Sequence, residues 1–500
     1  MLHVSPLFSD GAVLCREKEL RIFGEAEDGT LIQCELIDEN GSMLAKGSGI
    51  TREGRFLILL PPQSARTGCM LQLSSAADRF IARDIAIGEV FLAGGQSNME
   101  MELQSADEGP ELIKTHHHPQ IRYLNIPKFG SFSREREEAW KLVHWQKILP
   151  GEGCDISAVA YFFALRAEAR LNVPIGIIDC YLGGTSISCW MDEAWLRRTA
   201  EGQRYLSEYA ERSAGISMEM FIEMDKQFHQ ELDSWSARVS DYRSNHPGCS
   251  STEVTEAVGE CPWNPPDGPG SPYRPAGLYD TMLTPLLPSS LTAFLFYQGE
   301  TDAGRTEQYD VLMMSLIDRW RTAFQDETLP FLFVQLPMWI DQKAQDSKTW
   351  PLVRLAQSRV RDRMRNTGMV CLLDQGEFDN LHPTNKRVVG ERLFDVARSV
   401  ILHEQIAASP RILRKRVSAS TLELIADLPL CCVEKEAPAL LELAGADKIY
   451  VPAEAEVDQH ILRLTAPSVT HPLYARYAWT DFAQVNLFSA DGLPLVVCNI

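Results

Sequence analysis

A serine, a histidine and an aspartate stand in segments of this sequence that could assemble a nucleophilic site. Ser97 lies in LAGGQSNMEM, residues 92–101, and Asp379 and His382 lie in DNLHP, residues 379–383. A serine hydroxyl attacks a carbonyl only when a base takes its proton, and a histidine oriented by a carboxylate suits that task near neutral pH. The three residues therefore predict acyl transfer through a covalent acyl-serine.

Candidate donors for the resulting oxyanion follow two other apolar runs. Gly183 and Gly184 come after VPIGIIDCYL, and Gln298 ends LTAFLFYQ. Glycines let backbone N–H groups approach a reacting oxygen closely, and an amide side chain can add another donor. We expect the N–H groups of Ser97 and Gly184, with the Gln298 amide, to form an oxyanion hole.

Each of these features also has a purely structural interpretation. Ser97 alone is as readily a turn residue or a helix N-cap, Asp379 an Asx-turn residue, and the Gly183-Gly184 pair a strand-to-helix turn. His382, followed by proline, could be a loop residue packed over a helix. The joint occurrence favours the catalytic interpretation, because every feature follows a predicted strand.

From about residue 89 to residue 402, predicted strands alternate with predicted helices, which indicates an α/β domain. Apolar strands are expected at 89–94, 173–182, 291–298, 329–336 and 369–374, and helices at 157–171, 201–243, 307–325, 351–366 and 386–402. Strands that alternate with helices form a parallel sheet covered on both faces, and ligands bind at the carboxyl ends of its strands. The candidate residues should therefore meet at one rim.

Two β-rich regions are expected to flank this domain. Residues 1–88 and 403–500 contain short alternating or apolar runs separated by turn signals. Within the α/β domain, residues 244–280 are rich in Pro, Gly and Ser. Such long loops are often functional, so this one is a candidate cover for the site.

Composition narrows the class of function. The 500-residue chain has a formal net charge of −20, which argues against a nucleic-acid partner. It shows neither an 18-residue apolar run nor a secretory leader, so we expect no membrane association and a cytoplasmic location. The 12 cysteines are scattered without a CxxC pair, and His116-His117-His118 is interpreted as a solvated loop, so we expect no metal and no organic cofactor.

The pattern Gly-x-Ser-x-Gly of ordinary α/β-hydrolases fails here, because Met99 occupies its last position. Four blocks, GGQSNMEM, YLGGTSISCWM, FYQGETDAG and DNLHPTNKRVVGERL, resemble those of the sialate O-acetylesterase family of SGNH-type carbohydrate esterases. Segments near both ends resemble that family's flanking β segments. The resemblance implies a flavodoxin-like SGNH α/β fold between β-rich regions.

The same resemblance implies residue roles. Ser97 would be the nucleophile, His382 the general base and Asp379 its orienting acid, with Ser97, Gly184 and Gln298 forming the oxyanion hole. Supporting or substrate-binding positions would be Gln96, Asn98, Gly183, Trp190, Glu300 and Asp302. Glu300 and Asp302 are expected to brace their loop, and Trp190 to suit sugar stacking.

The predicted function is removal of acetyl groups from a sugar, with O-acetylated sialic acid as the first candidate. An esterase for acetylated xylan or pectin, and a non-catalytic carbohydrate-binding protein on the same scaffold, are the alternatives. A sialic acid carboxylate would need a local Arg or Lys, which the sequence does not locate. The partner is thus an acetylated sugar, and homo-oligomerisation is left open.

Overall fold

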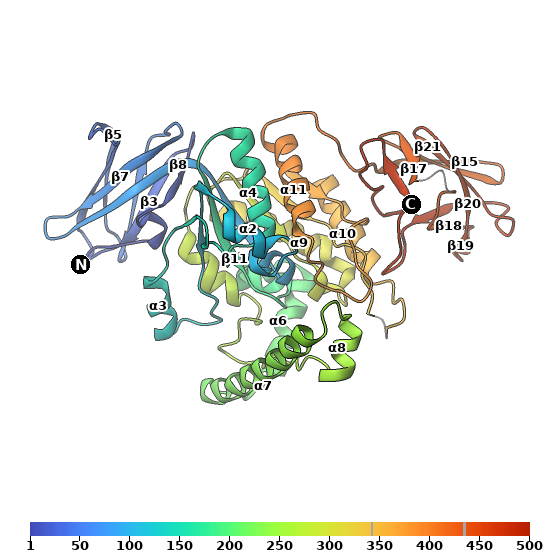
Figure 1. Cartoon of the computed structure of the whole chain (residues 1–500), viewed down its shortest axis with the longest axis horizontal. Coiled ribbons are helices and arrows are strands. Elements are labelled where there is room, and N and C mark those ends of the chain that lie inside the picture. Colours follow the sequence, from blue (N-terminus) through green and yellow to red (C-terminus); the bar gives the residue numbers. More distant parts are fainter. Residues whose placement is uncertain (342–343, 434–436) are drawn as a thin grey trace.

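The chain has three regions arranged along its long axis. The computed structural model describes residues 1–341, 344–433 and 437–500 (Figure 1). The N-terminal β-rich region lies at one end, the α/β region in the middle and the C-terminal β-rich region at the other end. Helices α6 (Ala200–Arg212), α7 (Met218–Asn245) and α8 (Ser251–Val258) extend from one side of the middle region.

A mostly parallel sheet forms the centre of the α/β region. Its strand order is β10-β9-β11-β8-β12-β13-β14, and only β10 runs antiparallel to its neighbour. The strands are β8 (Arg79–Gly95), β9 (His118–Asn125), β10 (Gln146–Ile148), β11 (Ile175–Tyr181), β12 (Ala293–Tyr297), β13 (Phe331–Val334) and β14 (Thr367–Val370). The predicted α/β class is confirmed, whereas β9 and β10 were not predicted.

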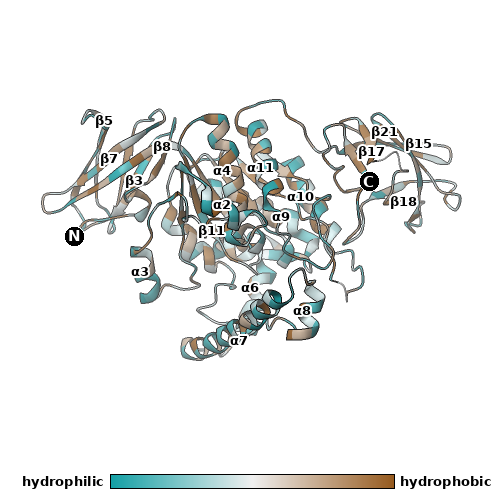
Figure 2. Cartoon of the chain, in the orientation of Figure 1, coloured by the Kyte–Doolittle hydropathy of each residue, from teal (hydrophilic) through white to brown (hydrophobic). Residues whose placement is uncertain are grey.

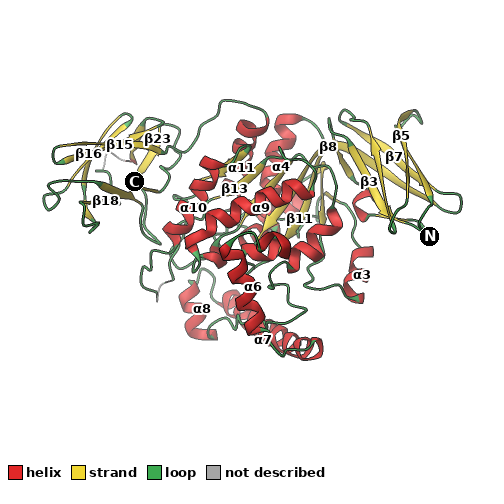
Figure 3. Cartoon of the chain, turned by 180° about the vertical axis from the view of Figure 1, so that it is seen from behind, coloured by secondary structure: helices red, strands yellow, loops and turns green. Residues whose placement is uncertain are grey.

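Helices cover both faces of this sheet (Figure 3). On one face, Phe91 of β8 packs edge-on against Phe163 at 4.8 Å. On the other face, Gly94 of β8 lies against Trp320. Side chains alternate along a strand, so residues 91 and 94 point to opposite sides. The first face carries α4 (Ala158–Leu171) and α11 (Lys386–Ile401), and the second carries α9 (Tyr309–Ala323) and α10 (Trp350–Arg363).

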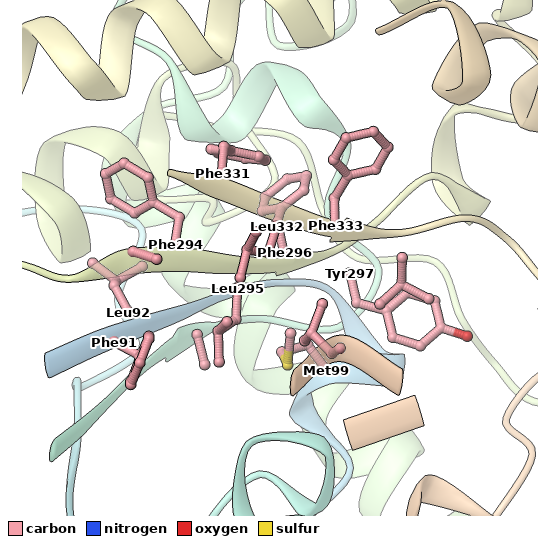
Figure 4. Packing of buried hydrophobic residues seen from close by; sticks show 14 of the residues in the cluster. Phe91, Leu92, Met99, Phe294, Leu295, Phe296, Tyr297, Phe331, Leu332 and Phe333 are labelled. Carbon is pink, nitrogen blue, oxygen red and sulfur yellow. The ribbon is translucent and has the colours of Figure 1, made fainter. Parts of the chain in front are cut away.

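An aromatic cluster on β12 and β13 (Figure 4) packs against Trp320 of α9. Phe294, Phe296 and Phe331 all lie within 5.8 Å of Trp320, measured between ring centroids. These rings are fully buried. Figure 2, coloured by hydropathy, shows hydrophobic strands inside the α/β region and mixed or hydrophilic helices outside it. The rigid sheet that results fixes the strand ends that carry the site.

Strand β8 joins the N-terminal region to the central sheet without a break. Its first half pairs with β7 (Arg66–Ser74) and β2 (Val13–Cys15), and its second half pairs with β11 and β12. The boundary expected near residue 88 therefore falls inside a 17-residue strand. β8 ends at Gly95, and Ser97 follows it after one intervening residue, Gln96.

The flanking regions are β-rich, as expected. The N-terminal strands are β1 (His3–Val4), β2 (Val13–Cys15), β3 (Leu20–Glu25), β4 (Leu31–Ile37), β5 (Met43–Ile50), β6 (Arg55–Leu60) and β7 (Arg66–Ser74). The C-terminal strands are β15 (Ile412–Ser418), β16 (Thr421–Ala426), β17 (Leu430–Cys432), β18 (Leu441–Ala444), β19 (Val451–Pro452), β20 (Glu454–Asp458), β21 (Ile461–Thr465), β22 (Tyr474–Tyr477), β23 (Leu487–Ser489) and β24 (Cys498–Asn499).

The long helix expected at 201–243 is two helices. α6 (Ala200–Arg212) ends before Gly215, which has a φ of +79°, and Ser217 caps the start of α7 (Met218–Asn245). A glycine in the left-handed region ends a helix, and a serine starts the next one. The loop expected at 244–280 also contains a short helix, α8 (Ser251–Val258). The remaining helices are α1 (Ser97–Glu100), α2 (Gly109–Thr115), α3 (Arg134–Lys141) and α5 (Glu193–Leu196).

The solvated loop predicted for the histidine run holds for the exposed His117 but is wrong for His116 and His118. His116 is buried, and its ring nitrogens contact the Tyr161 hydroxyl at 3.2 Å and the Glu152 carbonyl at 2.9 Å. His118 begins β9 and lies 2.8 Å from a carboxylate oxygen of Glu168. His118 stays partly exposed, and the buried part of β9 begins only at Ile121, so the polar start of this strand gave no signal of its structure.

Candidate active site

Ser97 and His382 meet at the carboxyl rim of the sheet. The Ser97 Oγ and His382 Nε2 atoms are 2.7 Å apart, which is a hydrogen bond although the two residues lie 285 positions apart in the chain. Ser97 opens the short helix α1 directly after β8. The fold therefore brings together the two residues on which the predicted nucleophilic site depends.

Gly95 makes this turn sterically feasible. Its φ is +131°, and a Cβ built on it would lie 2.1 Å from the Tyr297 carbonyl oxygen of the neighbouring strand. Only glycine fits both the conformation and the space. The close approach of β8 and β12 at this point places the residues that follow each strand side by side.

Asn98 connects the serine segment to the histidine segment. Its amide donates to the Leu381 carbonyl at 3.1 Å and to the Glu300 carboxylate at 2.6 Å. Its side-chain oxygen accepts from the Lys386 ammonium at 2.6 Å. Asn98 and Lys386 are buried, so this network holds the backbone beside His382 in one position.

Burial also sets the electrostatics of the pair. Desolvation, followed by the nearby Lys386 ammonium, lowers the pKa of His382 to about 4. Burial lowers the pKa of Lys386 to about 7, against the opposing pull of Glu300. Burial raises the pKa of Glu300. At neutral pH the imidazole is neutral, which is the form that can accept the serine proton.

Asp379 lies on the same turn but contacts another element. It has a φ of +59°, and its carboxylate accepts a hydrogen bond from the Thr252 hydroxyl of α8. Among the described residues, no hydrogen bond joins Asp379 to the His382 imidazole. The expected orienting role of Asp379 thus stays a prediction, and Thr252 is a partner that the sequence did not indicate.

Backbone donors are available beside Ser97. Within the described ranges, the N–H groups of Ser97 and Gly184 make no hydrogen bond to the protein, whereas the Gly183 N–H donates to Glu100. Gly183 packs against Ser97, because a Cβ built on it would lie 3.3 Å from the Ser97 Cβ. Both N–H groups are therefore available to a ligand, and their use as oxyanion donors stays a prediction.

Gln298 is placed differently from the prediction. Its side-chain NH₂ donates to Asp302, to the Thr185 carbonyl at 3.2 Å and to the Gln96 side-chain oxygen at 3.2 Å. Its own oxygen accepts from the Tyr309 hydroxyl at 2.8 Å. A buried amide with these partners has no donor left for an oxyanion, so the structure favours a bracing role.

Gln96, Glu300 and Asp302 brace the same rim. Gln96 accepts from the Gly299 N–H at 3.3 Å and the Thr301 N–H at 3.4 Å, which links β8 to the turn after β12. The buried Asp302 accepts from the Ile187 N–H at 2.9 Å and from the Tyr205 hydroxyl. Burial raises the pKa of Asp302, while these donors oppose the shift.

Trp190 cannot stack against a sugar. Its side chain is 0% exposed, it donates to the Thr185 hydroxyl at 3.1 Å, and its ring packs edge-on against Trp320. The expectation fails because the turn after Gly184 leads straight back into the core. A different tryptophan, Trp263 of the Pro-rich loop, lies on Gly184 and is 46% exposed.

Several residues of the site were missed at the level of sequence. Lys386 was counted only as the start of a helix, and Glu100 only as part of the GGQSNMEM block. Thr252 and Trp263 lie in a segment without regular periodicity, where spacing gives no signal. In the part of the chain that the structure describes, no group of three or more His, Cys, Asp or Glu side chains could hold a metal ion. No described helix is both long enough and apolar enough to span a bilayer.

Comparison with known proteins gives a consistent result. The family model described as carbohydrate esterase, sialic acid-specific acetylesterase, matches residues 87–214 and 263–398, more than half of the chain. Mouse sialate O-acetylesterase is 24% identical over 412 residues, covering 77% of this chain and 70% of the mouse protein. The rat enzyme is 27% identical over 354 residues, covering 64% of this chain and 58% of the rat protein.

A solved structure agrees over the whole length. A carbohydrate acetylesterase from Xanthomonas citri superimposes with a TM-score of 0.78 and 25% identity, covering 100% of this chain and 99% of that chain. The fold, the site and these relatives define a carboxylic ester hydrolase of the carbohydrate esterase class. The chain belongs to the sialic acid-specific acetylesterase family of carbohydrate esterases.

Proposed function

We propose that this protein removes O-acetyl groups from sugars through an acetyl-Ser97 intermediate. The observation that carries the proposal is the 2.7 Å contact between Ser97 Oγ and His382 Nε2 at the sheet rim. We also assign the fold to the flavodoxin-like SGNH hydrolases. The strands β11-β8-β12-β13-β14, numbered along the chain, have the order 2-1-3-4-5 of that type.

In the first half of the reaction, His382 Nε2 takes the Ser97 proton as Oγ attacks the acetyl carbonyl carbon. The carbonyl oxygen becomes an oxyanion, which the Ser97 and Gly184 N–H groups stabilise. His382 then gives its proton to the departing sugar oxygen, and the C–O bond breaks.

In the second half, His382 takes a proton from water as the water oxygen attacks the acetyl carbon. The resulting tetrahedral intermediate uses the same oxyanion donors. His382 returns the proton to Ser97 Oγ, and acetate leaves.

Replacement of the nucleophile tests this proposal directly. Ser97→Ala should lower kcat on an acetyl ester by about 10⁴-fold or more, without a shift in Tm, because the half-exposed hydroxyl contributes chemistry rather than packing. Ser42→Ala, in an N-terminal turn, is the matched control and should retain full activity. Activity of Ser97→Ala close to that of the control would end the proposal.

Asp379 is proposed to act on His382 as an acidic partner, three residues away on the same turn. The Asp379 carboxylate already accepts a hydrogen bond from the Thr252 hydroxyl. In the part of the chain that the structure describes, it forms no hydrogen bond with the His382 imidazole. We therefore expect Asp379→Asn to lower kcat less than His382→Ala does, in the same acetyl ester assay. A larger loss for Asp379→Asn would show that the imidazole depends on Asp379 more than its contacts indicate.

O-acetylated sialic acid is the proposed substrate, because two relatives bear the name sialate O-acetylesterase. A neutral sugar such as acetylated xylan is the second candidate. Two of the lysines that the structure describes near the site favour this second candidate, because Lys128 already pairs with Glu100 and the Lys386 ammonium donates to the Asn98 amide oxygen. Rates on O-acetylated sialic acid and on acetylated xylo-oligosaccharides, measured side by side, decide between them.

A further inference from the structure

Residues 215–262, called the insertion below, lie between the two segments that the family model matches. The family match stops at residue 214 and resumes at 263. The intervening segment holds α7 and α8, which extend beyond the α/β region in Figure 1. A segment outside the family pattern is where this chain could differ from its relatives in what it binds.

The chain returns from this insertion directly onto the site. A Cβ built on Gly184 would lie 2.3 Å from Cζ2 of Trp263, so the indole ring rests on the Gly184 backbone. The adjacent Gly183 packs against Ser97. Only Gly183 and Gly184 therefore separate Trp263 from the proposed nucleophile Ser97. Trp263 is 46% exposed to solvent.

Two aromatic rings and two prolines hold this indole. Phe228 of α7 and Tyr273 each lie 5.8 Å from Trp263, centroid to centroid, in edge-on geometry. Phe228 is buried, so α7 anchors the ring from the inserted side. Pro262 and Pro265 restrict the backbone on either side. The indole is thus fixed in place while part of its surface stays open.

Such a surface suits one face of a sugar ring. The C–H groups on the face of a pyranose are apolar and gain dispersion energy and burial on an aromatic plane. Binding sites combine such aromatic walls with a few polar groups that set orientation. A small acetyl ester, by contrast, needs only the serine, the base and the oxyanion donors.

We propose that Trp263 is the sugar-stacking wall of this esterase, and that the insertion 215–262 sets carbohydrate preference by holding it against Gly184. The inference rests on the proposed esterase function. It replaces Trp190, which is buried, as the aromatic residue that contacts substrate.

The test compares a sugar ester with a small ester. For Trp263→Ala, kcat/KM on an O-acetylated sugar should fall about tenfold, the effect expected for losing one aromatic contact. On 4-nitrophenyl acetate it should change less than twofold. Trp263→Phe should restore most of the sugar rate. Trp140→Ala, a half-buried tryptophan of α3, is the control and should change neither rate.

Two outcomes would overturn the inference. An equal loss on both esters would mean that Trp263 acts only by shaping the Gly184 backbone, and no loss on either would mean that it contacts no substrate. If Trp263→Ala unfolds, Trp263→Leu keeps the apolar packing without the aromatic face and must show the same selective loss. Failure of the esterase proposal itself is separate, since it would appear as full activity of Ser97→Ala.

Discussion

At the scale of single residues, the most consequential feature is the buried environment of His382. Its pKa of about 4 follows from desolvation and from the Lys386 ammonium. In the proposed mechanism the imidazole accepts the Ser97 proton only when it is neutral, so protonation of the imidazole stops the reaction. We expect kcat/KM on an acetyl ester to fall as the pH drops through about 4 and to stay level from pH 5 to 7. An acid limb near the ordinary histidine pKa of about 6.5 would contradict this.

Lys386 contributes to that low pKa through its charge. Lys386→Met removes the ammonium that disfavours the imidazolium, so the pKa of His382 should rise and the acid limb should move to higher pH. Lys141→Met, on the exposed side of α3, carries the same change of charge far from the site and should leave the limb in place. A pH profile of kcat/KM for both variants is the measurement, and an unmoved limb in Lys386→Met would refute the electrostatic link.

Gln298 separates two roles that the sequence alone could not distinguish. If it braces Asp302 and Tyr309, Gln298→Ala should reduce the free energy of unfolding by about 2 kcal/mol, because buried partners lose their hydrogen bonds. If it were an oxyanion donor, kcat would fall by about 100-fold or more at unchanged stability. Denaturant unfolding together with kcat decides, and we expect the first result.

At the scale of elements, the turn between β8 and α1 depends on Gly95. Gly95→Ala would place a methyl group 2.1 Å from the Tyr297 carbonyl oxygen, at a φ of +131°. We expect a loss of about 3 kcal/mol or more in the free energy of unfolding, with loss of activity. Gly29 has a φ of +80°, but no heavy atom lies within 4 Å of a Cβ built on it. Gly29→Ala therefore tests backbone strain alone and should lower the free energy of unfolding by only about 1 kcal/mol. Similar Tm values for the two variants would contradict the steric argument.

The same elements show what the sequence could predict. Strong periodicity located α4, α9, α10 and α11 to within a few residues, since each buries one face against the sheet. The strands β12 and β13 were recognisable because they are apolar throughout. Periodicity could not reveal β9, whose start carries a histidine and an exposed proline, nor the break between α6 and α7.

The residues of the candidate site also differ in whether the sequence could predict them. Ser97 and His382 could be paired from sequence because each follows a strand of a parallel sheet, and such ends share a rim. Trp190 and Gln298 were assigned to solvent-facing roles, but side-chain direction after a strand depends on packing that the sequence does not encode locally. Trp263 and Thr252 could not be found, since only the path of the chain after α7 brings them to the rim.

At the scale of the whole molecule, the C-terminal region supports the α/β region through residues 480–482. The Asp481 carboxylate accepts from the backbone N–H groups of Ser347 at 2.9 Å and Trp350 at 3.0 Å, at the start of α10. The Phe482 ring packs edge-on at 5.5 Å against Phe378, next to Asp379. The last region of the chain thus helps to hold the turn that carries His382.

Removing the charge at this contact should therefore weaken the whole chain. Asp481 is buried, and Asp481→Asn replaces one carboxylate oxygen by an NH₂ that faces N–H donors. We expect the free energy of unfolding to fall by about 2 kcal/mol and Tm to drop. Asp447→Asn, in an exposed C-terminal turn, is the control. Equal Tm values for the two variants would show that the contact is dispensable.

Strand β8 has a further consequence for the integrity of the enzyme. One uninterrupted stretch of backbone, Arg79–Gly95, is a member of two different sheets and ends two residues before Ser97. The N-terminal region is therefore not a detachable module: a fragment beginning at the apparent junction would lose half of this strand and the anchorage of its start. A cut ahead of residue 79 would keep β8 whole but would remove β2 and β7, the strands that pair with its first half, so it too would weaken the support of the strand that leads to Ser97.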